Sequence, residues 1–291
     1  MGKLASMASG HRSGPAGNRP CTLISGLVRG LLDLVYPSNI YCISCNVPIE
    51  TDLPYSLCEE CIRAIPWANE STCRKCGKAL ESWYGSTLCK DCHNLERNFD
   101  TGFTCAQYDT MTRSMLIQFK YQDQSYLGAH LGEVMADRMK ALDQNLDPKE
   151  DLVLAVPMHQ KKQRRRGYNQ AALLAREVAT RREKPFRSDL LLRRAETKAM
   201  FELTAKERRE NMRQAFYVPE HKAEQLRGKV ILLVDDIFTT GSTADACAQT
   251  LLAAGAKKVF LLTFASGFNS EAGAAQAVVA SPSQMRAKGP T

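Results

Sequence analysis

The segment Ile231–Thr243 reads ILLVDDIFTTGST: two adjacent aspartates end an apolar run, and a string of hydroxyl-bearing residues and glycine follows shortly after them. The apolar run from Lys229 to Phe238 predicts a strand of a parallel sheet that is buried on both faces. Residues 242–256 carry alanine, leucine and cysteine at helical spacing, and residues 257–267 form another apolar run. The predicted order of strand, loop, helix and strand is typical of an open α/β sheet.

The loop TTGST between the first strand and the helix lies where ligands bind in such sheets. Its glycine lets the backbone approach a ligand, its amides point outward and its hydroxyls donate hydrogen bonds, which together suit a phosphate dianion. The two carboxylates before it can accept hydrogen bonds from the vicinal hydroxyls of a ribose whose phosphate occupies the loop. A helix cap beside a surface acidic pair would explain only one serine and one aspartate. The predicted ligand-binding residues here are Asp235, Asp236, Thr239, Thr240, Gly241, Ser242 and Thr243.

A second strand, loop and helix are predicted over residues 151–179, DLVLAVPMHQKKQRRRGYNQAALLAREVA. The helix begins near Asn169, and the loop before it carries a run of lysines and arginines at 161–166. A further basic run lies at 206–213, and the formal net charge of the chain is +8. These runs predict a polyanionic partner, either phosphate ligands or nucleic acid, with a solvated basic surface as the alternative.

Eight of the eleven cysteines form four CxxC pairs, and the first two pairs recur 31 residues later as the last two. Each unit reads CxxC, twelve residues, CxxC, a spacing with which two tight turns complete the four-thiolate shell of a structural zinc. Because the whole four-cysteine unit repeats, we predict one zinc per unit, with a cross-braced arrangement as the alternative. The predicted metal ligands are Cys42, Cys45, Cys58 and Cys61 for one zinc and Cys73, Cys76, Cys89 and Cys92 for the other.

Other uses of the cysteine pairs explain the sequence less well. A disulfide framework is typical of small secreted domains, and the sequence predicts no export signal. A haem attachment site at Cys89–His93, CKDCH, would leave the other three pairs unexplained. A thioredoxin-like pair would follow a strand of a βαβ unit, which is not predicted here. Four sulfur ligands leave no position for water, so both zincs are predicted to be structural.

The composition is that of an ordinary globular protein, with 44% hydrophobic and 24% charged residues in a chain of 291. No uncharged apolar run approaches the roughly 18 residues that a membrane span requires. We therefore predict no membrane span and a cytoplasmic location. Residues 1–20 and 269–291 have the composition of a disordered extension and a disordered tail, and leucines at helical spacing predict an amphipathic helix over 21–37.

Taken together, these motifs resemble known families. The segment 231–243 resembles the phosphoribosyl pyrophosphate binding motif of type I phosphoribosyltransferases. Purine-salvage members of that superfamily carry an aspartate where this chain has Thr239, so the resemblance does not imply purine salvage. The cysteine repeat, FKYQ at 119–122, RGYNQ at 166–170 and the segment 231–243, in this order, resemble the ComF family, which is named for competence for DNA uptake in bacteria.

The resemblance covers about residues 30–267 and implies both the fold and the ligand. It implies a type I phosphoribosyltransferase-like parallel sheet flanked by helices over residues 96–268, preceded by a double zinc ribbon over residues 38–95. Phosphoribosyl pyrophosphate with Mg²⁺ is the implied ligand. The basic loop takes the place of the superfamily's pyrophosphate loop, which adds Lys161, Lys162 and Arg166 to the predicted ligand-binding residues.

Two functions follow from the resemblance, and no catalytic residue is predicted for either. In the first, the protein acts in DNA uptake and natural competence, binds phosphoribosyl pyrophosphate, and has single-stranded DNA and the uptake machinery as partners. In the second, it is an active phosphoribosyltransferase of nucleotide metabolism, similar to amidophosphoribosyltransferase, in which a nitrogen nucleophile displaces pyrophosphate. Bases of a single strand would stack on Trp67, Trp83 and Tyr84, with packing inside the ribbons as the alternative for Trp67.

Overall fold

The structure is a computed structural model that describes residues 40–50, 53–69, 71–80, 87–121, 124–145, 149–194 and 214–267. The predicted N-terminal extension, the predicted amphipathic helix and the predicted tail lie outside these residues, as does the basic run at 206–213. Within the described ranges, no helix combines the length and the apolar character needed to cross a bilayer.

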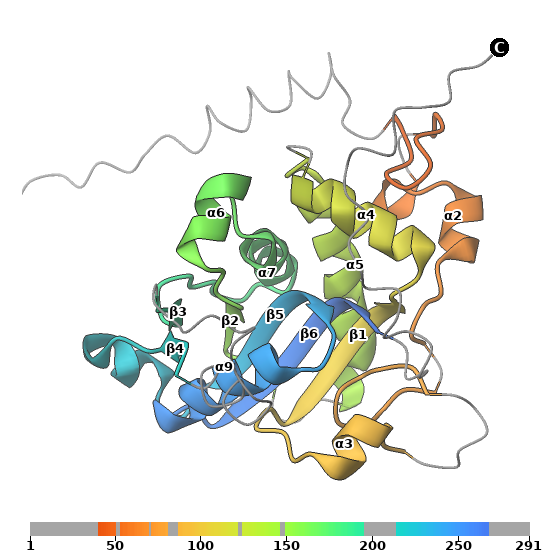
Figure 1. Cartoon of the computed structure of the whole chain (residues 1–291). Helices are drawn as coiled ribbons and strands as arrows, with labels where there is room; N and C mark the ends of the chain where they lie inside the picture. The colour runs from red at the N-terminus through yellow and green to blue at the C-terminus, as the bar shows by residue number, and fades with distance from the viewer. Residues whose placement is uncertain are drawn as a thin grey trace, which may run out of the picture.

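A four-stranded parallel sheet with the order β1-β6-β5-β2 forms the centre of the molecule (Figure 1). The first half of β5 and nearly all of β6 are buried, as the apolar runs of these two strands predict. Because all three strand pairs are parallel, the carboxyl ends of the strands meet at one edge of the sheet. This sheet confirms the predicted fold class. The strands are β1 (Thr101–Gln107), β2 (Leu152–Ala155), β5 (Val230–Phe238) and β6 (Lys258–Ser266).

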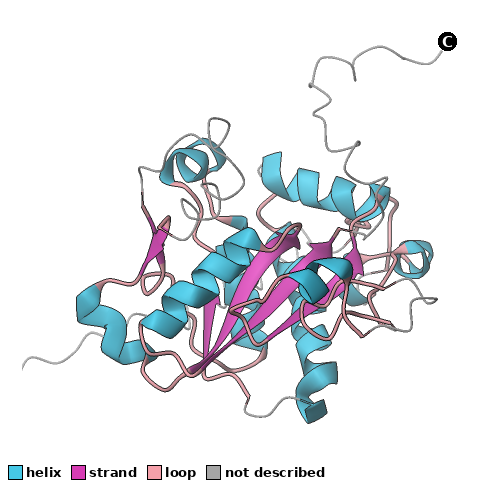
Figure 2. Ribbon diagram, turned by 60° about the horizontal axis from the view of Figure 1, so that its bottom comes forward, coloured by secondary structure: helices cyan, strands magenta, loops and turns pink. Residues whose placement is uncertain are grey.

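Helices cover both faces of the sheet, as Figure 2 shows. Helices α5 and α7 pack side by side on one face, and α9 packs against β5 and β6 on the other. Helix α9 buries Ala244, Ala246, Cys247, Ala248 and Leu251 at helical spacing, which explains why this segment packs as a helix. The helices of this domain are α4 (Thr110–Tyr121), α5 (Leu127–Leu142), α6 (Gln160–Arg166), α7 (Gln170–Arg181) and α9 (Ser242–Ala253).

Short elements lie beyond β2, where β3 and β4 form a separate two-stranded sheet. Phe186 forms a parallel bridge with Val153, and two short strands pair in antiparallel fashion nearby. The chain between these two strands, 195–213, lies outside the described residues. The remaining elements of this domain are β3 (Leu192–Arg193), β4 (Phe216–Tyr217) and the 3-10 helices η2 (Asp143–Asn145) and η4 (Glu220–Leu226).

The two cysteine units cover the other edge of the sheet, at β1. Trp67, just after the first unit, forms an antiparallel bridge with Ala106 of β1, and the second unit accepts a hydrogen bond from the Gly102 amide at the Lys75 carbonyl. Gly77 has a φ of +76°, and a Cβ there would lie 2.7 Å from the Gly102 carbonyl oxygen, so the second unit packs directly on the β1 backbone. An edge strand is thereby protected from pairing with other chains. The short helices here are η1 (Pro54–Ser56), α2 (Glu59–Ala64) and α3 (Lys90–Asn94).

Candidate functional site

The predicted phosphate loop lies between the carboxyl end of β5 and the first turn of α9. Gly241 has a φ of +76° and directly precedes the helix. A Cβ at this position would lie 2.5 Å from Cζ of Phe238, so both the backbone conformation and the space require glycine. The hydroxyl oxygens of Thr240 and Ser242 lie 3.0 Å apart on this solvent-exposed loop.

A small cavity opens at this loop, and its volume is about 50 Å³. That is several times the 10–15 Å³ or so needed to hold one water molecule. The amino end of a helix of this length carries unsatisfied amide groups and a positive partial charge, which favour an anion. The cavity brings together most of the predicted ligand-binding residues. Its lining consists of Asp235, Ile237, Phe238, Thr239, Thr240, Gly241, Ser242, Thr243, Ala244 and Thr263.

The two aspartates occupy different environments although they are adjacent. Asp235 pairs with Thr263 in the sheet register and accepts a hydrogen bond of 2.9 Å from the Asp236 amide at Oδ1. Burial raises the pKa of Asp235 well above its usual range, and the negative charge of Asp236 raises it further. The Asp236 carboxylate instead forms an ion pair of 2.6 Å with Nζ of Lys120, at the end of α4.

Lys120 is the residue of this site that the sequence did not assign. It belongs to the FKYQ string, whose position in the chain gives no sign that α4 brings it to the carboxyl end of β5. Its side chain is 20% exposed and that of Asp236 is 16% exposed, so the pair is largely withdrawn from water. One lysine therefore compensates part of the negative charge that two adjacent carboxylates concentrate here.

The predicted basic loop is for the most part a helix, which corrects the expectation from the sequence. His159 accepts a hydrogen bond from the Lys161 amide at the start of α6, and Gly167 ends the helix in the left-handed conformation. Lysine, arginine and glutamine are good helix formers, so a cap at each end is enough for a short helix. The predicted helix start near Asn169 is confirmed, since its side chain caps α7.

The predicted cations of this segment do not line the small cavity. Lys161 and Lys162 are exposed on α6, and the Nη1 of Arg166 donates to Oε1 of Gln170 at 3.2 Å. Helix α6 follows β2 at the same edge of the sheet as the phosphate loop (Figure 1). A larger cavity of about 270 Å³ lies on this side, lined by residues of α6, α7 and the β3–β4 pair, among them Arg193.

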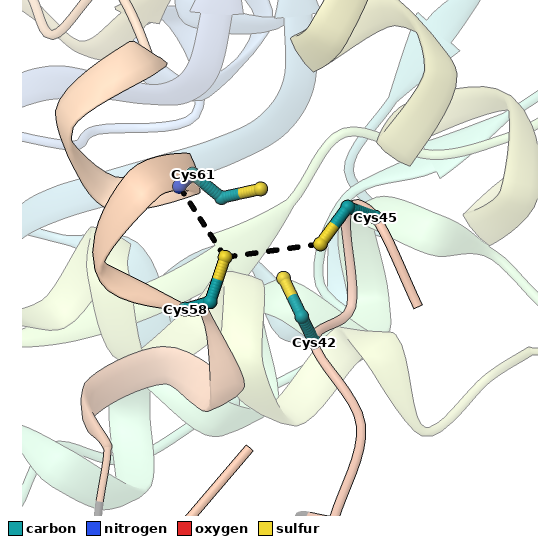
Figure 3. A group of neighbouring side chains, drawn as sticks. All are labelled: Cys42, Cys45, Cys58 and Cys61. Carbon is teal, nitrogen blue, oxygen red and sulfur yellow. Dashed lines mark hydrogen bonds between the residues drawn. The ribbon is translucent and has the colours of Figure 1, made fainter. Parts of the chain in front are cut away.

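The eight predicted metal ligands form two clusters. In each cluster the four Sγ atoms all lie within 4.8 Å of one another. Each cluster consists of the four cysteines of one sequence unit, so the arrangement is sequential rather than cross-braced. Figure 3 shows the first cluster, in which the Sγ atoms of Cys45 and Cys58 are 3.7 Å apart. The corresponding distance between Cys76 and Cys89 in the second cluster is 3.6 Å.

These distances fit a metal. Four zinc–sulfur bonds of about 2.3 Å in a tetrahedron place the sulfurs about 3.8 Å apart. The second cluster is the more buried of the two, since Cys73, Cys76 and Cys89 are each 1% exposed whereas Cys45 is exposed.

The predicted aromatic platforms are only partly described. Trp83 and Tyr84 lie outside the described residues. Trp67 is half-buried, and its Nε1 donates to the Ile62 carbonyl at 2.8 Å while its backbone bridges to β1. The ring therefore packs between the first cysteine unit and the sheet, which agrees with the predicted alternative of packing inside the ribbons.

Two family models match the chain in the order of its domains. The model described as a double zinc ribbon domain matches residues 31–93, and the model described as a phosphoribosyl transferase domain matches residues 130–278. The zinc-ribbon match includes both four-cysteine clusters, and the second match includes β5, the phosphate loop and α9.

Relatives extend over most of the chain. Competence protein F of Haemophilus influenzae is 28% identical over 76% of this chain and 94% of its own length. The DNA utilization protein YhgH of Escherichia coli O157:H7 is 27% identical over 75% of this chain and 93% of its own length. Among solved structures, glutamine phosphoribosylpyrophosphate amidotransferase from B. subtilis matches with a TM-score of 0.35 and 16% identity, over 50% of this chain and 30% of that chain. The two relatives confirm the resemblance to the ComF family.

Proposed function

Because the chain belongs to the phosphoribosyl transferase domain family, we propose that it binds phosphoribosyl pyrophosphate at the carboxyl edge of its sheet. The observation that carries this proposal is the cavity that combines a glycine-built helix start with the Asp235 carboxylate. Asp236, the next residue of β5, lies outside the cavity lining and pairs with Lys120. The amides and hydroxyls of residues 239–243 hold the 5'-phosphate. Asp235 and Asp236 accept hydrogen bonds from the ribose hydroxyls. The ribose hydroxyls of the bound ligand therefore keep hydrogen-bond partners in the complex.

The pyrophosphate of this ligand carries the negative charge that the remaining groups neutralise. Lys161, Lys162 and Arg166 are the cations that the family resemblance assigns to it, and they follow the strand next to β5. Mg²⁺ prefers oxygen ligands and usually binds through phosphates together with one or two carboxylates, so the aspartate pair and the pyrophosphate fit it. When bound, Mg²⁺ would neutralise part of the pyrophosphate charge. The charge of Asp236 is already compensated in part by its ion pair with Lys120.

Each four-cysteine cluster holds one structural zinc in this proposal. The sulfur spacing and the match to a double zinc ribbon support this assignment. Zinc supplies the folding free energy of modules that are too small to build a sufficient core of their own. Since all four positions are taken by sulfur, the zincs take no part in chemistry.

The relatives suggest the biological role. One is named for competence and the other for DNA utilization. We therefore assign this protein a cytoplasmic role in DNA uptake, with single-stranded DNA and the uptake machinery as its partners. The exposed lysines of α6 and the basic run at 206–213 supply the positive charge that phosphates of a single strand would meet.

Calorimetry with phosphoribosyl pyrophosphate and Mg²⁺ tests the proposal. Wild-type protein is expected to bind at one site, and Asp235→Asn with Asp236→Asn is expected to abolish binding. Asp151→Asn is the matched control, because Asp151 accepts a hydrogen bond of 2.9 Å from the Val230 amide at the opposite end of β5. Normal binding by the double variant would refute the site.

A second assay on the same samples decides between the two functions. Pyrophosphate is measured after ammonia or another amine is added to the complex. Binding without release supports the accessory role. Release that depends on the amine and is lost in the double variant would instead identify the protein as an active transferase.

A further inference from the structure

The segment that follows the second cysteine unit contacts the phosphate loop and the start of α9 through hydrogen bonds. Arg97 donates from Nη2 to the Thr240 carbonyl at 2.9 Å. Asn98 donates from its amide and its Nδ2 to the two carboxylate oxygens of Asp245, at 2.5 and 3.0 Å. Asp245 lies in the first turn of α9, so these contacts fix both the loop and the start of the helix.

A buried lysine connects the second cysteine cluster to the end of β5. Lys78 is 5% exposed, and its Nζ lies 2.8 Å from Oδ2 of Asp91. Asp91 stands between the ligands Cys89 and Cys92, while Lys78 follows the other CxxC turn of the same cluster. The same Nζ lies 5.6 Å from the centre of the Phe238 ring, within the range of a cation–π contact. The geometry of the cluster therefore sets the position of Phe238.

Phe238 in turn contacts the phosphate loop at Gly241. Its ring stands edge-on to Phe99 with 6.1 Å between centroids. The ring also fills the space that a Cβ of Gly241 would need, and Nη1 of Arg97 lies 3.2 Å from that same position. Packed interiors transmit displacements because they contain little empty space. A shift of Phe238 or Arg97 must therefore move the backbone that forms the phosphate site.

The first cysteine unit and the linker that joins it to the second unit make contacts with α5, which provide an internal control. Among the described residues, Ser56 shares a hydrogen bond of 3.1 Å with Nδ1 of His130, on α5. Arg138, also on α5, donates from Nη2 to the Ala68 carbonyl at 2.6 Å. This arginine matches Arg97 in type and in its bond to a backbone carbonyl between the ribbons and the sheet domain, but it lies away from the phosphate loop.

We propose that Arg97 and Lys78 are positioning residues that couple the second zinc ribbon, and not the first, to the phosphate loop. The inference rests on the proposed binding of phosphoribosyl pyrophosphate. An intact second cluster favours the ligand-competent loop, and a loop that holds the ligand favours an intact second cluster in return, because coupling between two binding sites is reciprocal.

Variants that leave the cysteines untouched test the coupling. In calorimetry with phosphoribosyl pyrophosphate and Mg²⁺, Arg97→Ala and Lys78→Met are each expected to raise Kd about tenfold, within the range usual for coupled sites. Arg97→Lys is expected to recover part of the affinity, since it keeps a donor for the Thr240 carbonyl. Arg138→Ala is the matched control and is expected to leave Kd within about twofold of wild type. Equal Kd values for Arg97→Ala and Arg138→Ala would overturn the proposal.

The two clusters can also be compared directly. Cys89→Ser and Cys58→Ser remove equivalent ligands from the second and first clusters. Amide hydrogen exchange of residues 239–243, measured by mass spectrometry, is expected to speed up in Cys89→Ser and to stay as in wild type in Cys58→Ser. In wild-type protein with two zincs, the ligand is expected to slow the loss of one zinc to a chelator and to leave the other unchanged. Slowing of both losses, or of neither, would contradict the coupling.

The hydrogen-exchange arm separates failure of this inference from failure of the proposed function. If wild-type protein does not bind phosphoribosyl pyrophosphate, the proposed ligand is wrong, and exchange of residues 239–243 still reports the coupling. If wild-type protein binds the ligand but Arg97→Ala, Lys78→Met and Cys89→Ser all leave both Kd and exchange unchanged, the ligand stands and the coupling is refuted.

Discussion

The ion pair between Lys120 and Asp236 allows a quantitative test of the site's electrostatics. Replacing Lys120 by methionine keeps much of the side-chain volume and removes the charge that lies 2.6 Å from the carboxylate. Exposed ion pairs contribute about 0.2–1 kcal/mol, whereas removing one partner of a buried pair costs about 3–5 kcal/mol. With side-chain exposures of 20% and 16%, this pair lies between the two cases, so we expect a loss of about 2 kcal/mol.

The expected loss can be measured by thermal unfolding at constant zinc concentration. For a domain of this size, 1 kcal/mol corresponds to about 2–4 °C, so Lys120→Met is expected to lower Tm by about 4–8 °C. The loss should grow as pH rises. Lys120 opposes the elevation of the Asp235 pKa, and without it the folded state disfavours the ionised carboxylate still more.

A double-mutant cycle isolates the pair from other effects of the substitution. Lys120→Met and Asp236→Asn are measured singly and together, and the coupling energy is expected to exceed 1 kcal/mol or so. The pair of Arg63 and Glu59 on α2, at 2.9 Å with exposures of 78% and 71%, is the control and is expected to give about 0.5 kcal/mol or less. Equal coupling energies for the two pairs would refute the electrostatic account of the site.

Three further predictions follow from the same structure. Elemental analysis of the purified protein is expected to find two zincs per chain, and one or fewer would contradict the assignment of the two clusters. Because the pKa of Asp235 is raised in the folded state, the protein loses stability as pH rises above the pKa of about 4 that this carboxyl has in the unfolded chain. The stability of Asp235→Asn in urea titrations should therefore increase relative to wild type as pH rises. A stability difference that does not change with pH would argue against burial as the cause of the raised pKa. If single-stranded DNA binds at α6, Lys161→Ala with Lys162→Ala should reduce the slope of log K against log salt by about 1.4, whereas Lys229→Ala with Lys257→Ala, exposed at the opposite end of the sheet, should not change it.

The sequence was most informative where the physics is local. A continuous apolar run followed by glycine and hydroxyl residues can form little other than a buried strand and a loop that starts a helix, and β5 and α9 have that form. The spacing of the cysteines likewise determines which four can share one metal, because each CxxC turn supplies two ligands.

The contacts that complete the site could not be read from the sequence, because they depend on tertiary packing. Lys120 and Arg97 come from segments far from β5 in the chain, and no local pattern indicates that their charges meet Asp236 and the Thr240 carbonyl. The helical form of the basic segment was missed for a different reason. A run of like charges suggested a loop, while the two caps at His159 and Gly167 allow a short helix.

A crystal structure of the full chain with phosphoribosyl pyrophosphate and Mg²⁺ tests the central claim most directly. We predict that the 5'-phosphate oxygens lie within hydrogen-bond distance, about 2.7–3.2 Å, of the amides of residues 240–243. The ribose hydroxyls are expected to contact the carboxylates of Asp235 and Asp236. A phosphate found instead on α6 alone, with the loop before α9 empty, would contradict the account.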